Sequence, residues 1–153
     1  MKKISYFCIL SLVSSLLSCK DANQELLNDI SGTWKVDEIT YSSYPYTVPD
    51  SVVKYPSGVL QFDNCQLTGS IRECSGFYKL VNSEVVSIVY NANAARNQTF
   101  ISIMSSFPKF INLRGAYTIT RSGNQMTLSG PQENIIDYKG QKIKIQLYLH
   151  SLK

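Results

Sequence analysis

The stretch IKIQLYLH, residues 143–150, decides the fold class of this chain. Ile143, Ile145, Leu147 and Leu149 alternate with Lys144, Gln146, Tyr148 and His150 over the whole segment. Successive side chains of a β-strand point to opposite faces of a sheet, so an apolar residue at every second position predicts a strand with one buried face and one solvated face. The rest of the chain must supply the strands that pair with it.

Upstream of this segment, short stretches rich in Tyr, Val, Ile, Thr and Phe alternate with turn residues at roughly ten-residue intervals, as in all-β proteins. Arg121-Ser122-Gly123-Asn124 is typical of a hairpin turn between two of them. Before the first strand, the polar residues 20–29 predict a tether that includes a short amphipathic turn or helix around Leu26 and Leu27. The predicted strands before the last one are 33–41, 59–62, 76–80, 84–90, 99–107, 116–120 and 125–129.

Eight strands in succession favour a single antiparallel up-and-down β-barrel, because a closed sheet leaves no edge open to aggregation. A barrel of this size has an interior that is filled by side chains or holds one small ligand. A flattened β-sandwich is the alternative fold. The residues expected to point inward are Val36, Leu60, Phe62, Tyr78, Leu80, Tyr117, Ile119, Leu128, Ile145 and Leu147.

The N-terminus has the pattern of an export signal. Lys2 and Lys3 precede an apolar stretch from Ile4 to Leu17 that is broken only by serines. This stretch is shorter than the ~20 apolar residues that span a bilayer. A charged start followed by a short apolar core predicts a signal peptide, residues 1–18.

Leu16-Leu17-Ser18-Cys19 resembles the lipobox of bacterial lipoproteins. The resemblance implies that Cys19 is acylated, with palmitate or a similar chain, and becomes the first residue of a membrane-anchored protein. At least two acyl chains are needed for stable anchoring. The alternative is an ordinary signal peptide with an incidental cysteine. The expected organisation is a signal peptide (1–18), a lipidated tether (19–29) and one barrel domain (30–153).

Charge and cysteine content exclude some functions. Of the fifteen basic residues two leave with the signal peptide, and the others form no cluster, whereas a nucleic-acid surface shows a basic stripe. Cys65 and Cys74 are expected to form a disulfide in an oxidising compartment, worth roughly 2–3 kcal/mol. The alternative, a metal site, would lack ligands because His150 is the only histidine. We therefore expect no nucleic acid, metal or other cofactor.

The segment Ile30-Ser31-Gly32-Thr33-Trp34-Lys35-Val36 resembles the first motif of the lipocalin family, Gly-x-Trp at the start of the first strand. The arrangement is most similar to short lipocalin-like lipoproteins of Bacteroidetes, and residues 117–128 resemble their late hairpin. The resemblance implies a barrel over residues 30–150 and a structural role for Gly32 and Trp34. In the family this tryptophan packs beneath a late basic residue, which cannot be assigned here, and the second motif, Thr-Asp-Tyr, is absent.

Residues 41–56, YSSYPYTVPDSVVKYP, hold four tyrosines and three prolines. Prolines fix φ and remove a donor, so we predict a semi-rigid loop rather than a strand. By its position in lipocalins this loop is expected to fold over the open mouth as a lid. The alternative is a solvated connection packed on the rim. Within it, Asp50-Ser51-Val52 resembles the O-glycosylation acceptor of exported Bacteroidetes proteins, which makes Ser51 a candidate site.

The leading functional hypothesis is a binding protein for a small, largely apolar ligand. The alternative is a structural or protein-interaction lipoprotein with a filled barrel and a tyrosine-rich docking loop. We expect no enzyme, because one histidine at the end of the last strand does not fit a nucleophile–base arrangement. Lys20-Asp21 after the anchor resembles Bacteroidetes surface-export signals, so the expected location is the outer membrane, on either face. Candidate ligand-binding residues are Tyr44, Tyr46, Phe62, Tyr78 and Tyr117.

Overall fold

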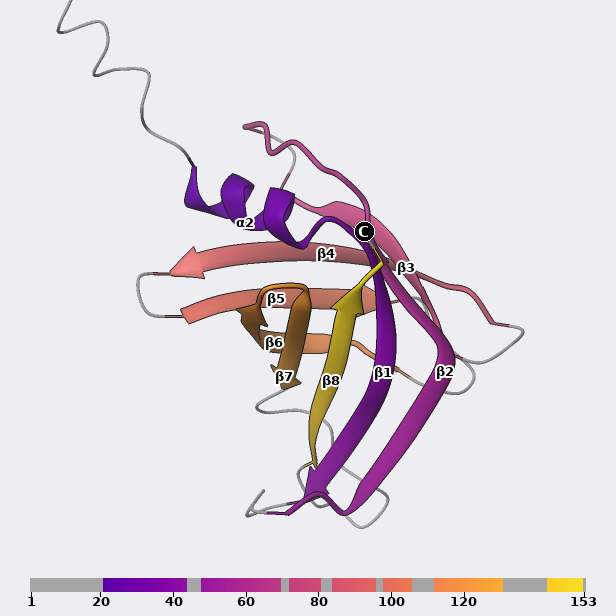
Figure 1. Cartoon of the computed structure of the whole chain (residues 1–153). Helices are drawn as coiled ribbons and strands as arrows, with labels where there is room; N and C mark the ends of the chain where they lie inside the picture. The colour runs from indigo at the N-terminus through magenta and orange to yellow at the C-terminus, as the bar shows by residue number, and fades with distance from the viewer. Residues whose placement is uncertain are drawn as a thin grey trace, which may run out of the picture.

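A computed structural model describes residues 21–43, 48–69, 72–80, 84–95, 98–105, 112–130 and 143–152. Helix α2 (Ala22–Ile30) precedes the strands and lies across one end of the barrel (Figure 1). The strands are β1 (Gly32–Ser43), β2 (Ser51–Phe62), β3 (Cys74–Lys79), β4 (Val86–Ala95), β5 (Gln98–Ser105), β6 (Gly115–Ser122), β7 (Gln125–Gly130) and β8 (Ile143–Ser151).

The strands form a closed antiparallel barrel in which each pairs with its neighbours in sequence. Closure is made by β1, whose Trp34 lies opposite Leu60 of β2 on one side and Ser151 of β8 on the other. The predicted up-and-down barrel is therefore confirmed, and the flattened sandwich is wrong. Each predicted strand is present; most observed ends differ from the prediction by a few residues, but β2 begins at Ser51, eight residues before the predicted start.

The inner wall of the barrel is apolar, as the period-two pattern predicts. In β8, Ile145, Leu147 and Leu149 are buried, while the residues between them are partly exposed. All ten residues predicted to point inward are buried. Burying one aliphatic side chain contributes about 1.5–3 kcal/mol, so this wall is the main source of stability.

The prediction that residues 41–56 form a loop is wrong. β1 continues to Ser43 and β2 begins at Ser51, so the connection between them is only 44–50. Pro56 lies inside β2, where the register with β1 shifts between the pairs Val36–Gly58 and Glu38–Lys54. A proline is tolerated at such a bulge because no ladder hydrogen bond is required from its nitrogen.

The antiparallel strands run between two ends of the barrel. We call the end covered by α2 the helix end and the opposite one the loop end. At the helix end β1, β3, β5 and β7 begin and β2, β4, β6 and β8 end. At the loop end the odd-numbered strands end and the even-numbered strands begin.

Helix α2 is the helix that the sequence predicts around Leu26 and Leu27. The Asp21 side chain accepts a hydrogen bond from Asn23 N at 2.9 Å, the standard arrangement of an N-cap. Leu27 and Ile30 on one face are buried in the core. Among the described residues no helix has the length and apolar character needed to cross a membrane.

Candidate functional site

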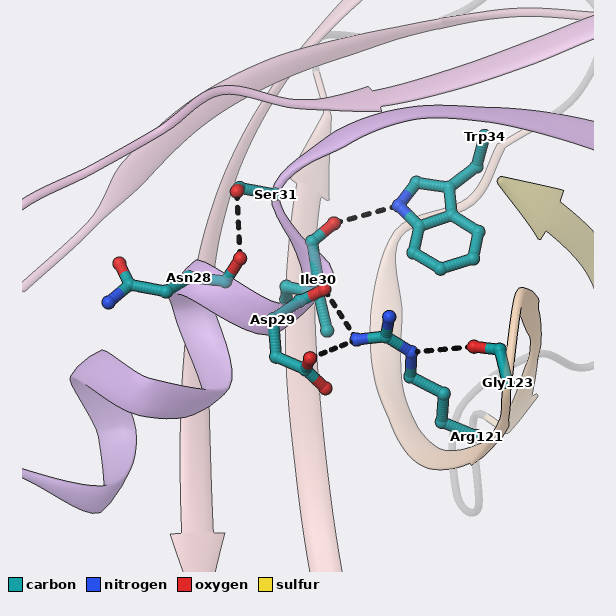
Figure 2. A network of polar contacts seen from close by, with 7 residues as sticks. All are labelled: Asn28, Asp29, Ile30, Ser31, Trp34, Arg121 and Gly123. Carbon is teal, nitrogen blue, oxygen red and sulfur yellow. Dashed lines mark hydrogen bonds and ion pairs between the residues drawn. The ribbon is translucent and has the colours of Figure 1, made fainter. Parts of the chain in front are cut away.

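Trp34 joins the helix end of the barrel to α2. Its ring is buried, and its Nε1 donates a hydrogen bond to the carbonyl oxygen of Ile30 at 2.7 Å (Figure 2). Gly32, two residues earlier, has a φ of 119°, a value that a residue with a Cβ rarely adopts. The Gly-x-Trp motif therefore has a physical explanation here: the glycine permits the turn from α2 into β1, and the tryptophan fills the space beneath it.

Arg121, at the end of β6, covers Trp34 from the side of the β6–β7 hairpin. Its guanidinium carbon is 5.5 Å from the centroid of the Trp34 ring, within the range of a cation–π contact. Its Nη1 donates to the carbonyl oxygen of Asp29 at 2.6 Å and pairs with the Asp29 carboxylate, and its Nε donates to Gly123 O at 3.3 Å (Figure 2). A cation beside the last turn of α2 also suits the negative end of the helix dipole.

Arg121 is thus the basic residue over the tryptophan that sequence reasoning did not assign. The signal was available in the topology. In an up-and-down barrel the even-numbered strands end where the first begins, so a basic residue just before the predicted Gly123-Asn124 turn lies at the same end of the barrel as Trp34. Gly123 has a φ of 58°, which a tight hairpin turn favours.

A disulfide and side-chain hydrogen bonds close the rest of the helix end. The predicted disulfide between Cys65 and Cys74 is present, with the Cα atoms 5.7 Å apart. Gln24 of α2 donates to the Cys65 carbonyl oxygen at 2.8 Å and accepts from Leu67 N at 2.7 Å. These contacts fix the 63–73 connection against α2, so this end is held by covalent, polar and apolar contacts together.

Phe62, the last residue of β2, lies toward this closed end, where its cross-strand partner in β3 is Gly76. Its ring makes an edge-on contact with Tyr90, with centroids 4.8 Å apart. The Tyr90 hydroxyl donates to Asp63 O at 2.8 Å. Both aromatic side chains are buried and have their partners within the protein, which is the pattern of a structural core.

Toward the loop end, two predicted residues come together around Leu113. Tyr117 of β6 and Tyr78 of β3 are both buried. The Tyr117 hydroxyl donates to Leu113 O at 3.0 Å, and the Tyr78 hydroxyl is in hydrogen-bond contact with the Leu113 backbone and the Ser105 side chain. Leu113, just before β6, is itself fully buried. The segment before β6 therefore carries polar contacts into an otherwise apolar interior.

Two further tyrosines belong to this group, and sequence reasoning missed them. Tyr41 of β1 and Tyr55 of β2 form a side-chain hydrogen bond with each other. Tyr41 and Tyr78 are both close enough to affect the titration of Tyr117. We call Tyr41, Tyr55, Tyr78 and Tyr117 the tyrosine cluster. It is contributed by four strands and lies in the half of the barrel nearer the loop end.

The phenols of the cluster are held in their neutral form. Burial raises the pKa of Tyr117, and the nearby phenols of Tyr78 and Tyr41 raise it further. Burial likewise raises the pKa of Tyr41, with Tyr55 as a second cause. A neutral phenol both donates and accepts a hydrogen bond. The cluster can therefore offer a hydrogen-bond donor or acceptor to a polar group inside the barrel.

The inner wall becomes accessible at the loop end. Ile39 of β1 and Val53 of β2 are direct cross-strand partners and share the inward face. Ile39 is 0% exposed, whereas Val53 is 38% exposed. Tyr41 and Ile143, which also point inward at this level, are only partly buried. A molecule entering from this end meets Val53, Ile143 and Tyr41 first and the buried Tyr78 and Tyr117 below them.

The remaining predicted site residues have different positions. Cys19, Tyr44 and Tyr46 lie outside the described residues, and Ser51 is exposed at the start of β2. His150 is half-buried, with its Nδ1 2.5 Å from a carboxylate oxygen of Asp37. Within the described ranges no three His, Cys, Asp or Glu side chains come together as metal ligands would.

The fold places this chain among closed eight-stranded antiparallel barrels of lipocalin-like architecture. No protein-family model matches the chain, and neither does any curated protein or any solved structure. The function must therefore be argued from the barrel and its two ends.

Proposed function

We propose that this chain is a lipid-anchored protein of the cell envelope whose barrel binds a small, largely apolar molecule at the loop end. The observation that carries the proposal is the tyrosine cluster, in which four strands each contribute one buried or partly buried tyrosine to an otherwise apolar wall. Ligand sites are typically concave and mostly apolar, with a few polar groups that orient the ligand.

The cluster defines the chemistry of the ligand. The apolar body would contact the inward face near Val53 and Ile143, which retains exposed area in the free protein. A hydroxyl, carbonyl or carboxyl group at its inner end would reach the phenols. The ligand must be small, because Leu60, Leu128 and Leu147 fill the barrel below this level.

The lipid anchor fits this orientation. Asp21, the N-cap of α2, follows Cys19 by two residues, which span at most about 7 Å. An acylated Cys19 would thus hold the helix end close to the bilayer and leave the loop end facing the solution. We propose the outer membrane as the location, on the basis of the lipobox and the Lys20-Asp21 sequence.

Native mass spectrometry of the protein purified from its own membranes tests whether a ligand is bound. We expect a mass beyond that of the polypeptide, its acyl chains and any glycan. A titration with 11-(dansylamino)undecanoic acid tests the site itself. Loss of one hydrogen bond in Tyr78→Phe should weaken binding about fivefold. Tyr90→Phe, the matched change at the helix end, should leave binding unchanged.

The second candidate is an interaction lipoprotein with a filled barrel. Full burial of Leu60, Leu113 and Tyr117 favours it, because side chains of the protein itself occupy the middle of the barrel. The same experiments separate the two candidates. A filled barrel would show no additional mass and no saturable binding of the dansylated fatty acid.

A further inference from the structure

Strand β2 has two halves with different numbers of partners. Residues 59–62 pair with β1 on one side and β3 on the other. Residues 51–54 pair with β1 alone. In the part of the chain that the structure describes, no strand lies along their other side, because the pairing with β3 stops at Val59. Among the described residues this short strand edge at the loop end is therefore unpaired.

The side chains on this edge are exposed as well. Val52 is 50% exposed and Val53 is 38% exposed, and the flanking Ser51 and Lys54 are also exposed. Unpaired backbone donors and acceptors beside exposed apolar residues form a template for another strand. Pro56 limits this template, since it has no N–H to offer a partner strand. The usable edge is the segment Asp50-Ser51-Val52-Val53-Lys54.

We propose that this edge pairs with the same edge of a second copy, as antiparallel strands related by a two-fold axis at Val52. In this register Asp50 of each copy lies opposite Lys54 of the other, and Ser51 lies opposite Val53. Two opposite-charge pairs then flank a central valine pair. The two sides of a two-fold interface are the same surface, so that surface must be complementary to itself. This segment meets the condition because its acidic end lies opposite its basic end. Opposite charges placed across strands stabilise a pairing, and like charges oppose it.

The charge pattern favours a second copy over an unrelated peptide. Within one chain Lys54 already lies opposite Glu38 of β1. Asp50 of the second copy would lie on the other side of Lys54, so acidic, basic and acidic side chains would alternate across three strands. A partner strand without an acidic residue at that position would gain nothing from Lys54.

The contact is small, and its size determines how it must be measured. A five-residue pairing buries much less than the roughly 1,200 Å² of a stable interface, so the dimer dissociates readily in dilute solution. Confinement of both copies to one membrane raises their effective concentration and favours the pairing. That last step rests on the proposed anchor; the pairing itself requires neither the ligand nor the tyrosine cluster.

Disulfide trapping in the membrane tests the proposal with the full chain. Cysteines at the two-fold axis would face each other with Cβ atoms about 4.5–5.5 Å apart, near the range that a disulfide bridges. We expect Val52→Cys to give a covalent dimer under mild oxidation, seen on a non-reducing gel. Val85→Cys is the matched control, since Val85 is 61% exposed and lies outside β2. A Ser51→Ala background removes any sugar at that position.

Charge reversal then tests the register. Lys54→Asp added to Val52→Cys would place two acidic residues opposite each other at both ends of the pairing, and the dimer yield should fall at least fivefold. Lys54→Arg keeps the charge and should keep the yield. The proposal is overturned if Val52→Cys dimerises no faster than Val85→Cys. It is equally overturned if Lys54→Asp leaves the yield unchanged, or if the adduct contains a different polypeptide.

Discussion

At the helix end, a disulfide and the stacked pair of Trp34 and Arg121 hold α2 against the barrel. At the loop end, Val53 of the inner wall is partly exposed, and the polar groups are phenols in the interior. Among the described residues, the contacts that tie separate elements together are thus concentrated at the helix end.

The largest effect should come from Trp34→Ala at the helix end. The change removes a buried ring, its hydrogen bond to Ile30 and the surface on which Arg121 stacks. Removal of a buried aromatic side chain costs about 3–5 kcal/mol. Equilibrium urea unfolding measures the loss, with Val85→Ala as an exposed control that should change little. A loss below about 1 kcal/mol would show that the two ends do not differ in this way.

The second effect concerns the disulfide. Cys65→Ala with Cys74→Ala opens a loop with a sequence separation of 9 and should lower the free energy of unfolding by about 2–3 kcal/mol. Reducing agent should shift the urea midpoint of the parent protein to that of the double variant. It should leave the variant itself unchanged. If reduction has no effect on the parent protein, the covalent link does not contribute to the stability of this end.

The fold was largely predictable because strand periodicity is a local signal. In β8 every second residue from Ile143 to Leu149 is apolar, and the structure follows that pattern. β2 was predicted too short because Pro56 and the tyrosines around it are typical of loops. A bulge beside a free edge accommodates a proline, and neither feature is visible in local sequence.

Only two of the four tyrosines in the candidate site could be predicted from the sequence. Tyr78 and Tyr117 follow simple alternation within their strands, so their inward direction could be predicted. Tyr41 could not, because the register shift between Val36 and Glu38 inverts the alternation in β1. Beyond the shift Ile39 points inward where strict alternation assigns Glu38. The position of a bulge depends on how neighbouring strands pair, and the pattern of residues within one strand does not show it.

The loss of stability at alkaline pH shows whether water reaches the buried phenols at each end of the barrel. Burial raises the pKa of Tyr117 near the loop end and of Tyr90 at the helix end. The unfolded chain ionises its tyrosines near pH 10, so the stability from each phenol is complete below that pH and is lost as the pH rises above it. The loss is about 1.4 kcal/mol per pH unit for each phenol kept neutral.

Two matched variants isolate these contributions. Tyr117→Phe and Tyr90→Phe should each lower stability by about 1 kcal/mol at pH 8, since Leu113 O and Asp63 O lose their donors. Both variants should then lose less stability than the parent between pH 10 and 11, measured as urea midpoints. If only Tyr90→Phe shows this smaller loss, water already reaches Tyr117 and the interior near the loop end is wet.

The smallest effect on stability should come from Val53→Ala. This variant is informative when its cost is compared with that of Val36→Ala. Both valines point into the barrel, but Val36 lies deep in the wall and is fully buried, whereas Val53 is 38% exposed near the loop end. Truncation at Val36 should cost about 2–3 kcal/mol, and truncation at Val53 less than about 0.5 kcal/mol. Bound ligand would cover Val53, so saturation with the dansylated fatty acid should make the second truncation measurable. Equal costs in the free protein would mean that the loop end is packed as tightly as the rest of the barrel and has no room for a ligand beside Val53.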